Sequence, residues 1–180
     1  MTLHSDDPDY WAIAEAIPAE QHGGATVCVS KHLVEVVMQK GLAKVPVMIA
    51  YGTRIPEEQA RFSATPFTVV YSGRMLEEQK RISLILATLE SACTLDPRIQ
   101  AVLIGDGQGA VAAKARVAEA GLAERIRFTG RLAPEKVADQ LIQCQASLLM
   151  SDFEGLPLTL LETMALGVVP VVRSIESGIP

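Results

Sequence analysis

The stretch SLLMSDFEGLPLTLLETMALGVVPVV, residues 147–172, decides the fold of this chain. It begins and ends with a short apolar run, at 147–150 and 169–172, and the residues between the two runs are amphipathic. Gly155 permits unusual backbone angles, and Pro157 suits the first turn of a helix because it lacks the amide hydrogen that would go unpaired there. The stretch therefore predicts a strand, a loop, a helix and a second strand.

The same alternation extends through the rest of the chain. The predicted strands are 25–29, 45–50, 67–71, 101–104, 126–128, 147–150 and 169–172, and the predicted helices are 31–40, 79–95, 110–120, 134–144 and 157–166. From residue 67 onward strands and helices alternate without a break, which is typical of parallel strands joined by right-handed crossovers. We therefore predict an α/β fold, a Rossmann-like parallel sheet with helices on both faces.

Composition narrows the class of protein. The chain of 180 residues is 49% hydrophobic but only 4% aromatic, which is typical of a sheet covered on both faces by helices. A net charge of −5 with few aromatic residues argues against a nucleic-acid partner. The apolar runs are shorter than the roughly 18 residues that a membrane span needs, and the N-terminus lacks the pattern of a signal peptide. Cys28, Cys93 and Cys144 are far apart, which predicts buried thiols and not disulfides or a zinc site.

The segment 52–66 is typical of a linker, because it holds Pro56, a polar run and Pro66. We place a domain boundary there, between residues 1–55 and residues 56–180. The other end of the chain, 170–180, is a predicted strand that runs into a loop without a closing helix. We therefore expect an incomplete domain with an exposed apolar edge and a tendency to low stability or association.

The loop after the predicted strand 147–150 is the first candidate site. The amides of Leu158 and Thr159 would open a helix at the carboxyl edge of the sheet, where the helix dipole attracts anions. Glu154 and Glu162 flank this positive end, and a carboxylate accepts paired hydrogen bonds from vicinal hydroxyls. These residues suit a ligand with a phosphate and sugar hydroxyls. The alternative is that Glu154 is an ordinary acidic residue of the first helical turn and that Glu162 lies on a solvated helix face.

Two glycine turns follow predicted strands. Gly73-Arg74 with Lys80 would supply cations for a phosphate, although these cations could equally balance acidic neighbours on an exposed loop. The turn at 105–109 has glycine at every second position, which departs from the Gly-x-Gly-x-x-Gly of dinucleotide-binding proteins. It is weak evidence for a dinucleotide site.

Histidine does not form a nucleophile triad here. His4, His22 and His32 all lie in the first part of the chain. His4 precedes an acidic run, and by itself it is typical of an ordinary loop. The acidic residues near it lack the glycine and the later glutamate of a calcium-binding loop.

Taken together, the motifs resemble the retaining GT-B glycosyltransferases, specifically glycosyltransferase family 4, the group 1 transferases. The resemblance runs from about residue 27 to residue 180. It rests on 29–30, 47–52, 73–74 with Lys80, 104–107, 128–132, 154–162 and 164–172. In two places the chain departs from the family pattern. Tyr51 stands where the family often has Asn before Gly52, and Arg81 stands where Gly is frequent.

The resemblance implies a truncated C-terminal domain of a GT-B fold. Residues 1–55 would be the tail end of the N-terminal, acceptor-side domain with the hinge, and residues 56–180 the donor-binding domain, incomplete at its C-terminus. The implied reaction transfers a sugar from a nucleoside diphosphate sugar to an acceptor hydroxyl of a glycan, lipid or small molecule, with retention of configuration. No cofactor and no metal are implied. The expected location is cytoplasmic, with possible peripheral association with the inner face of the cell membrane.

The resemblance also implies residue roles. Arg74 and Lys80 would bind the donor diphosphate, together with the helix-start amides near Leu158 and Thr159. Glu154 and, more loosely, His4 are the implied catalytic residues, and both would contact the donor sugar. Gly155 and Leu156 would bind the donor beside Glu154, and Glu162 would bind the ribose. The base would lie against Gly130, Arg131 and Leu132.

Three alternatives remain open at this point. The chain could be a binding fragment without catalytic activity, because the active site of a GT-B enzyme lies between two domains. It could also be a sugar-nucleotide epimerase of the same architecture. A dehydrogenase is the most distant alternative.

Overall fold

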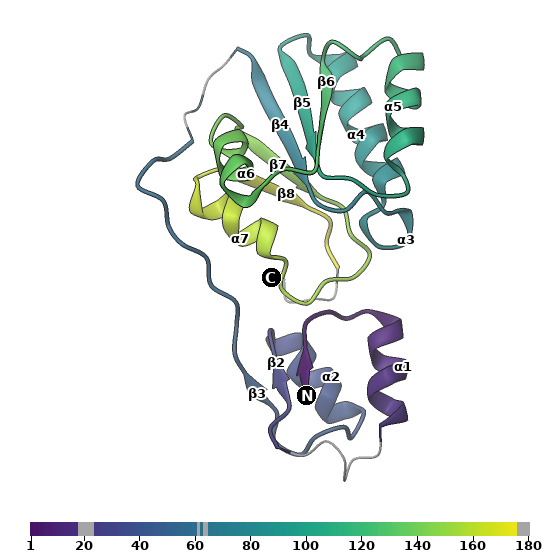
Figure 1. Ribbon diagram of the computed structural model, residues 1–180, viewed down its shortest axis with the longest axis vertical. Helices are drawn as coiled ribbons and strands as arrows, with labels where there is room; N and C mark the ends of the chain where they lie inside the picture. Colours follow the sequence, from purple (N-terminus) through teal and green to yellow (C-terminus); the bar gives the residue numbers. More distant parts are fainter. Residues whose placement is uncertain (18–23, 61, 63–64, 176–180) are drawn as a thin grey trace. The chain divides into compact units, whose positions relative to one another are not determined.

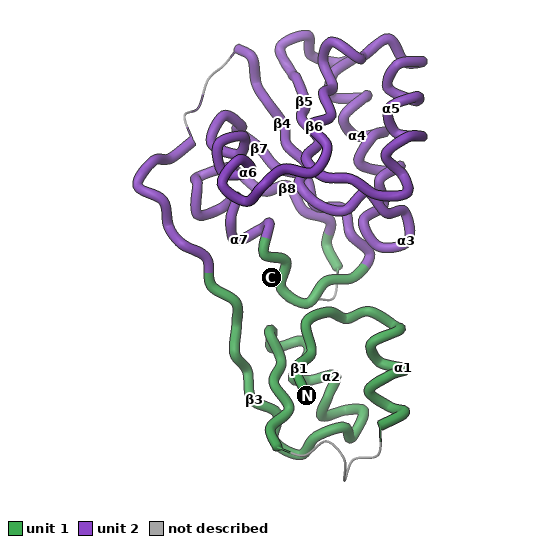
Figure 2. The backbone as a smooth tube through the Cα atoms, viewed as in Figure 1, with its two compact units in different colours: residues 1–52, 153–158, 174–180 green, residues 53–152, 159–173 purple. Residues whose placement is uncertain are grey.

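The computed structural model describes residues 1–17, 24–60, 62 and 65–175. Two compact units make up the chain (Figure 2). The smaller unit comprises residues 1–52, 153–158 and 174–180, and the larger unit comprises 53–152 and 159–173. His22 and the last residues of the predicted C-terminal loop, 176–180, lie outside the described residues.

The larger unit contains a five-stranded parallel sheet (Figure 1). Its strands are β4 (Phe67–Ser72), β5 (Ile99–Ile104), β6 (Ile126–Gly130), β7 (Ala146–Leu149) and β8 (Val169–Val172). They lie in the order β6-β5-β4-β7-β8, and every neighbouring pair is parallel. The prediction of an α/β fold with a Rossmann-like parallel sheet is confirmed.

Helices cover both faces of this sheet. They are α3 (Glu77–Lys80), α4 (Ile82–Leu95), α5 (Ala110–Glu119), α6 (Pro134–Leu141) and α7 (Leu158–Ala165). Side chains alternate along each strand, so Val69 and Tyr71 pack in one core with α4 and α5, whereas Val70 packs in the other with Leu141 and Leu166. The apolar runs of the sequence are buried on both sides for this reason.

The predicted helix 79–95 is broken in the structure. Arg81 has φ 54° and ψ 53°, the left-handed conformation, and it separates the short α3 from α4. Continuous helix cannot pass through a left-handed residue, so α4 begins at Ile82. Glycine adopts this conformation without a steric cost, which explains why glycine suits the position of Arg81.

The smaller unit has a three-stranded parallel sheet in the order β1-β2-β3. Its elements are β1 (Thr2–Leu3), α1 (Pro8–Ala16), β2 (Val27–Cys28), α2 (Lys31–Gln39) and β3 (Val47–Met48). The predicted strands 25–29 and 45–50 contain only two strand residues each, and β1 and α1 were not predicted. Asp7 caps α1 by accepting a hydrogen bond from the Asp9 amide, and a proline follows it directly, so this start signal was present in the sequence.

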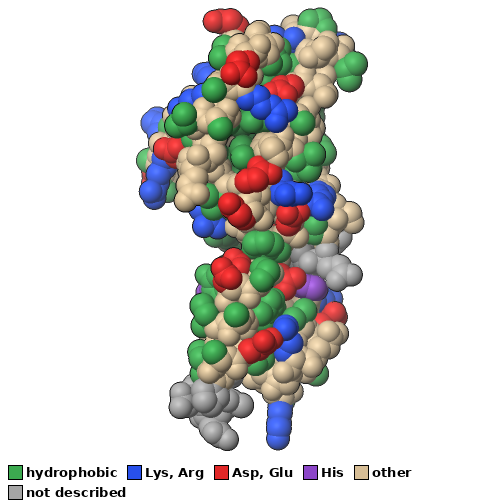
Figure 3. All heavy atoms as spheres, turned by 90° about the vertical axis from the view of Figure 1, so that its right-hand side faces the viewer, with side chains coloured by type: hydrophobic (Ala, Val, Ile, Leu, Met, Phe, Trp, Pro, Cys, Tyr) green, Lys and Arg blue, Asp and Glu red, His purple; other side chains and the backbone are tan. Residues whose placement is uncertain are grey.

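The charged surface and the burial of the cysteines match what the composition predicts. Acidic and basic side chains are interspersed over the visible face of the larger unit (Figure 3). Cys28, Cys93 and Cys144 are buried and free, as predicted, and burial raises the pKa of the Cys144 thiol to about 12. Within the described residues, every helix is too short or too polar to cross a membrane.

Candidate functional site

The order of the strands places the candidate residues at one edge of the larger sheet. From β4 the chain first adds β5 and β6 on one side of the sheet and then adds β7 and β8 on the other side. Parallel sheets form a ligand-binding crevice at such a point, outside the carboxyl ends of the strands. Arg74 follows β4, the glycine turn follows β5, and Arg131 follows β6, so all three lie at this edge.

The loop that carries Arg74 is held by backbone hydrogen bonds. The amide of Gly73 donates to the Ile104 carbonyl at 3.0 Å, and the amide of Met75 donates to the Asp106 carbonyl at 2.9 Å. The Tyr71 hydroxyl donates to the carbonyl of Arg74 itself at 2.6 Å. The position of the Arg74 backbone is therefore fixed by β5 and by the turn that follows it.

The glycine turn at 105–109 packs against this loop. A Cβ atom on Gly105 would lie 1.9 Å from the Gly73 carbonyl oxygen, and one on Gly107 would lie 2.6 Å from the Met75 carbonyl oxygen. Both glycines also have positive φ, at 128° and 155°. Here the glycines allow two loops to approach each other closely, which accounts for a spacing that differs from the dinucleotide-binding pattern.

The side chain of Arg74 is exposed and held at its tip. Its Nη2 donates to the Oε1 atom of Gln79 at 2.8 Å, and Gln79 is buried. The carbonyl of Gln79 accepts a hydrogen bond from the Asp152 amide at 2.9 Å, which links α3 to the end of β7. Sequence reasoning missed Gln79, because nothing in the sequence pattern distinguishes it from a polar residue on a helix surface.

Further cations gather around Asp152. Arg81 Nε lies 3.2 Å from one carboxylate oxygen of Asp152, and Arg173 pairs with the other. Arg81 also approaches Glu77 at 3.9 Å. Arg81 and Arg173 are thus paired with carboxylates, whereas the Arg74 guanidinium donates to a neutral amide, Gln79, and keeps its charge for an anion.

A cavity of about 850 Å³ opens in the larger unit. Ser72, Leu132 and Glu162 are among its lining residues, together with apolar side chains of α6. Although the side chain of Glu162 is partly exposed, desolvation by the surrounding residues raises its pKa. Four further carboxylates and one arginine line it as well, namely Glu57, Glu58, Glu135, Asp139 and Arg54. The cavity therefore combines an apolar wall with acceptors for the hydroxyls of a ribose.

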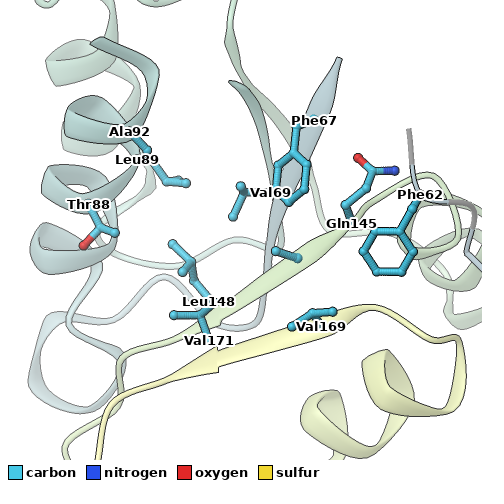
Figure 4. Close-up of a pocket in the computed structure, with 11 residues that line it drawn as sticks. Phe62, Phe67, Val69, Thr88, Leu89, Ala92, Gln145, Leu148, Val169 and Val171 are labelled. Atoms are coloured by element: carbon cyan, nitrogen blue, oxygen red, sulfur yellow. The ribbon is translucent and has the colours of Figure 1, made fainter. Parts of the chain in front are cut away.

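A second cavity, of about 330 Å³, lies on the opposite face of the sheet (Figure 4). Leu89 of α4, Val69 of β4, Leu148 of β7 and Val171 of β8 point into it. No charged residue is among the described residues that line it. It therefore lacks the groups that would orient a phosphate or a sugar.

In the smaller unit, the predicted Glu154 loop lies against His4. A Cβ atom on Gly155 would lie 2.2 Å from the carbonyl oxygen of His4, so only glycine fits there without displacing one of the two segments. Glu154 is buried, and Leu156 packs against the core of this unit. Two segments that are far apart in the sequence, at His4 and at Gly155, thus contact each other in the smaller unit.

The segment after His4 is anchored through Asp6. One carboxylate oxygen of Asp6 accepts a hydrogen bond from Trp11 Nε1 at 2.7 Å, and the other lies 2.8 Å from His32 Nε2. The acidic run is therefore a structural anchor and a helix cap. Within the described part of the chain, no group of His, Cys, Asp and Glu could hold a metal ion.

The predicted site residues fall into two sets. The set in the larger unit comprises Arg74, Lys80, Gly130, Arg131, Leu132, Thr159 and Glu162. The set in the smaller unit comprises His4, Glu154, Gly155, Leu156 and Leu158. Leu158 and Thr159 form the start of α7, which was predicted one residue earlier.

Solved structures show where this architecture occurs. The chain is 26% identical to the lipopolysaccharide outer core galactosyltransferase WaaB over 84% of its own length and 43% of that protein, with a TM-score of 0.67. A mutant of S. aureus TarM in complex with fondaparinux, α-GlcNAc-glycerol and UDP gives a TM-score of 0.80 at 16% identity, over 98% of this chain and 37% of TarM. Anabaena HepE in complex with UDP and glucose gives 0.66 at 20% identity, over 82% and 44%.

The fold is thus that of the Rossmann-like C-terminal domains of GT-B glycosyltransferases. The chain spans less than half the length of each of these three proteins. No curated protein sequence matches it. The sequence family described as glycosyl transferases group 1 matches residues 54–180, which is more than half of the chain. This protein therefore belongs to the group 1 glycosyltransferases.

Proposed function

We propose that this chain supplies the donor-nucleotide site of a retaining glycosyltransferase of family 4. The reaction transfers a sugar from a nucleoside diphosphate sugar to an acceptor hydroxyl. The observation that carries this proposal is the cavity of about 850 Å³ with Glu162 in its wall. Arg74, which lies two residues beyond the cavity-lining Ser72, is fixed at the same sheet edge.

The nucleoside would occupy this cavity. Glu162 would accept hydrogen bonds from the two ribose hydroxyls, since a carboxylate has enough lone pairs for both. Leu132 lines the wall where a base would lie, and Gly130 and Arg131 precede it on the chain. Backbone atoms of these residues would recognise the edge of the base.

The diphosphate would be held by cations. We assign it to Arg74 and Lys80, with the amides of Leu158 and Thr159 at the start of α7. At an effective dielectric constant near 20, one cation at 4 Å from a unit negative charge contributes about 4 kcal/mol. Two cations and a helix start can therefore offset the charge of the leaving diphosphate without a metal ion.

The sugar contacts would come from the smaller unit. Glu154, Gly155 and Leu156 form the loop that lies against His4. A carboxylate and an imidazole on neighbouring segments can together bind several hydroxyls of one sugar. UDP is present in the TarM and HepE structures, which makes UDP-sugars the first donors to test.

Calorimetric titration with UDP, GDP and ADP, and with their sugars, tests the proposal. We expect Arg74→Ala to weaken nucleoside diphosphate binding about 10- to 100-fold, because a charge-assisted hydrogen bond contributes roughly 1.5–3 kcal/mol. Lys80→Ala should act in the same direction. Arg98→Ala is the matched control, since Arg98 precedes β5 and so lies before a strand, whereas Arg74 follows one.

Two results would overturn the proposed site. One is the absence of binding for all three nucleoside diphosphates. The other is an equal effect of Arg74→Ala and Arg98→Ala, which would show that binding follows total charge and not this edge of the sheet. Chelation of divalent ions should leave binding unchanged, and a loss of binding on chelation would overturn the assignment of the charge to Arg74 and Lys80.

A further inference from the structure

Tyr51 contacts the imidazole of His4 in the smaller unit. The Tyr51 hydroxyl meets His4 Nδ1, and the two rings lie edge to edge in nearly the same plane, with centroids 5.8 Å apart and planes 5° apart. The two residues are 47 positions apart in the sequence. A ring contact and a hydrogen bond between the same two side chains define both the plane of the imidazole and the identity of the nitrogen that faces Tyr51.

The Tyr51 hydroxyl can donate to Nδ1 or accept from Nδ1–H, according to the tautomer of the imidazole. Partial burial, and the neighbouring Tyr10, raise the pKa of Tyr51, so the phenol keeps its proton at neutral pH. A neutral imidazole has one donor and one acceptor nitrogen. If Nδ1 accepts from Tyr51, the ring proton lies on Nε2, which becomes the donor that His4 presents to a ligand.

The backbone of His4 is held separately. Its carbonyl packs against Gly155, and Asp6 anchors the following segment to Trp11 and His32. The main freedom left to His4 is rotation of its side chain, which is exposed. The contact with Tyr51 restricts that rotation.

We propose that Tyr51 is a positioning residue, which orients His4 so that Nε2–H donates a hydrogen bond to a hydroxyl of the donor sugar. This inference rests on the proposed function, in which His4 contacts that sugar. It gives a reason for tyrosine at a position where asparagine was expected from the family resemblance, since the longer side chain carries its hydroxyl to Nδ1 of His4.

NMR of the imidazole nitrogens tests the contact itself. In Tyr51→Phe the ring remains but the hydroxyl is lost, so the ¹⁵N resonance of His4 Nδ1 should shift. The resonances of His32, which is paired with Asp6, should remain in place. An unchanged His4 Nδ1 resonance in Tyr51→Phe overturns the inference.

A double-mutant cycle tests the consequence for binding. The measured quantity is the ratio of the affinities for UDP-glucose and for UDP, or for the nucleotide and sugar that bind best. We expect Tyr51→Phe to lower this ratio about threefold and His4→Ala to lower it about tenfold, as the loss of one hydrogen bond implies. In the His4→Ala background, Tyr51→Phe should have no further effect, because Tyr51 acts through His4.

The outcomes separate this inference from the proposed function. If no nucleoside diphosphate binds, the proposed function is wrong and the inference falls with it. If UDP binds normally but the effects of the two substitutions on the ratio simply add, only the positioning role is wrong. A purely structural role for Tyr51 would lower the affinity for UDP and for UDP-glucose equally, which would also overturn the inference.

Discussion

The Arg74 loop of the larger unit and the Glu154 loop of the smaller unit are held in different ways. The first is fixed by hydrogen bonds to β5 and to the turn that follows it. The second lies against the backbone of His4, about 150 residues earlier in the chain, at a distance that only Gly155 permits. The first loop is thus supported by the sheet that carries it, and the second by a remote segment.

This difference predicts how each loop responds to substitution. The support of the Arg74 loop belongs to the core of the larger unit, so damage to it should reduce global stability. The Glu154 loop packs on the smaller unit through Leu156 and through the close approach of Gly155 to His4, so damage to that approach should act mainly on ligand binding.

Gly105→Ala should have the largest effect. The added methyl would lie 1.9 Å from the Gly73 carbonyl oxygen, at a position whose φ of 128° is unfavourable for alanine. Overpacking and backbone strain together should lower the free energy of unfolding by about 3 kcal/mol or more, measured by urea denaturation. Gly121→Ala is the control, because Gly121 has positive φ but nothing within 4 Å, and it should cost about 1 kcal/mol. Equal losses for the two variants would show that the loop contact contributes nothing.

Gly155→Ala should have a smaller effect on stability, of about 1–3 kcal/mol, and a selective effect on binding. The methyl would displace the backbone of His4, so the affinity for the nucleotide sugar should fall while the affinity for the nucleoside diphosphate is kept. Gly52→Ala, which meets nothing within 4 Å, is the control for calorimetry of both ligands. An equal fall for both ligands would contradict the assignment of this loop to the sugar.

Gln79→Leu should weaken nucleoside diphosphate binding about threefold, because Arg74 keeps its charge but loses the acceptor that holds its guanidinium. The effect should be smaller than that of Arg74→Ala in the same titration. Gln143→Leu, at an exposed position after α6, should leave binding unchanged. If Gln79→Leu binds as well as the unmodified protein, the guanidinium does not need this support.

A fall in pH should slightly lower the stability of the larger unit, through Glu77 of α3. Hydrogen bonds from the side chain and the amide of Ser83 lower the pKa of Glu77 from 4.5, so the folded state holds this proton more weakly than the unfolded chain does. The stabilisation is therefore present above pH 4.5 and is lost as the pH falls through the lowered pKa. Glu77→Gln should flatten the fall in stability below pH 4.5 by a small amount, measured by denaturation at several pH values. Ser83→Ala should reduce the same dependence, and an unchanged pH profile in both variants would contradict this origin.

The sheet could be predicted from the sequence because its signal is local. The apolar runs at β4, β7 and β8 are short, are bounded by turns and alternate with helices, which is sufficient for a parallel sheet. Right-handed connections fix the hand of each crossover, but the reversal at β4 that forms the crevice is seen only in the structure. Arg74 and Glu162 could be proposed for the same reason, since each lies just beyond a strand or in the helix that follows one.

The remaining features depend on contacts that the sequence pattern does not encode. The break at Arg81 went unpredicted because arginine rarely adopts positive φ. The roles of Gln79 and Tyr51 require knowledge of which segments meet in space. The glycines at 105 and 107 were visible, but their purpose depends on the loop after the neighbouring strand.

The grouping of residues 153–158 with the smaller unit has a consequence for protein engineering. A chimera joined at Gly52 would combine a foreign N-terminal segment with a loop shaped to fit the backbone of His4. Donor-sugar preference should therefore not transfer with residues 53–180 alone. An exchange that keeps His4, Tyr51 and the 153–158 loop from the same parent preserves these contacts, so the unit of exchange is discontinuous in the sequence.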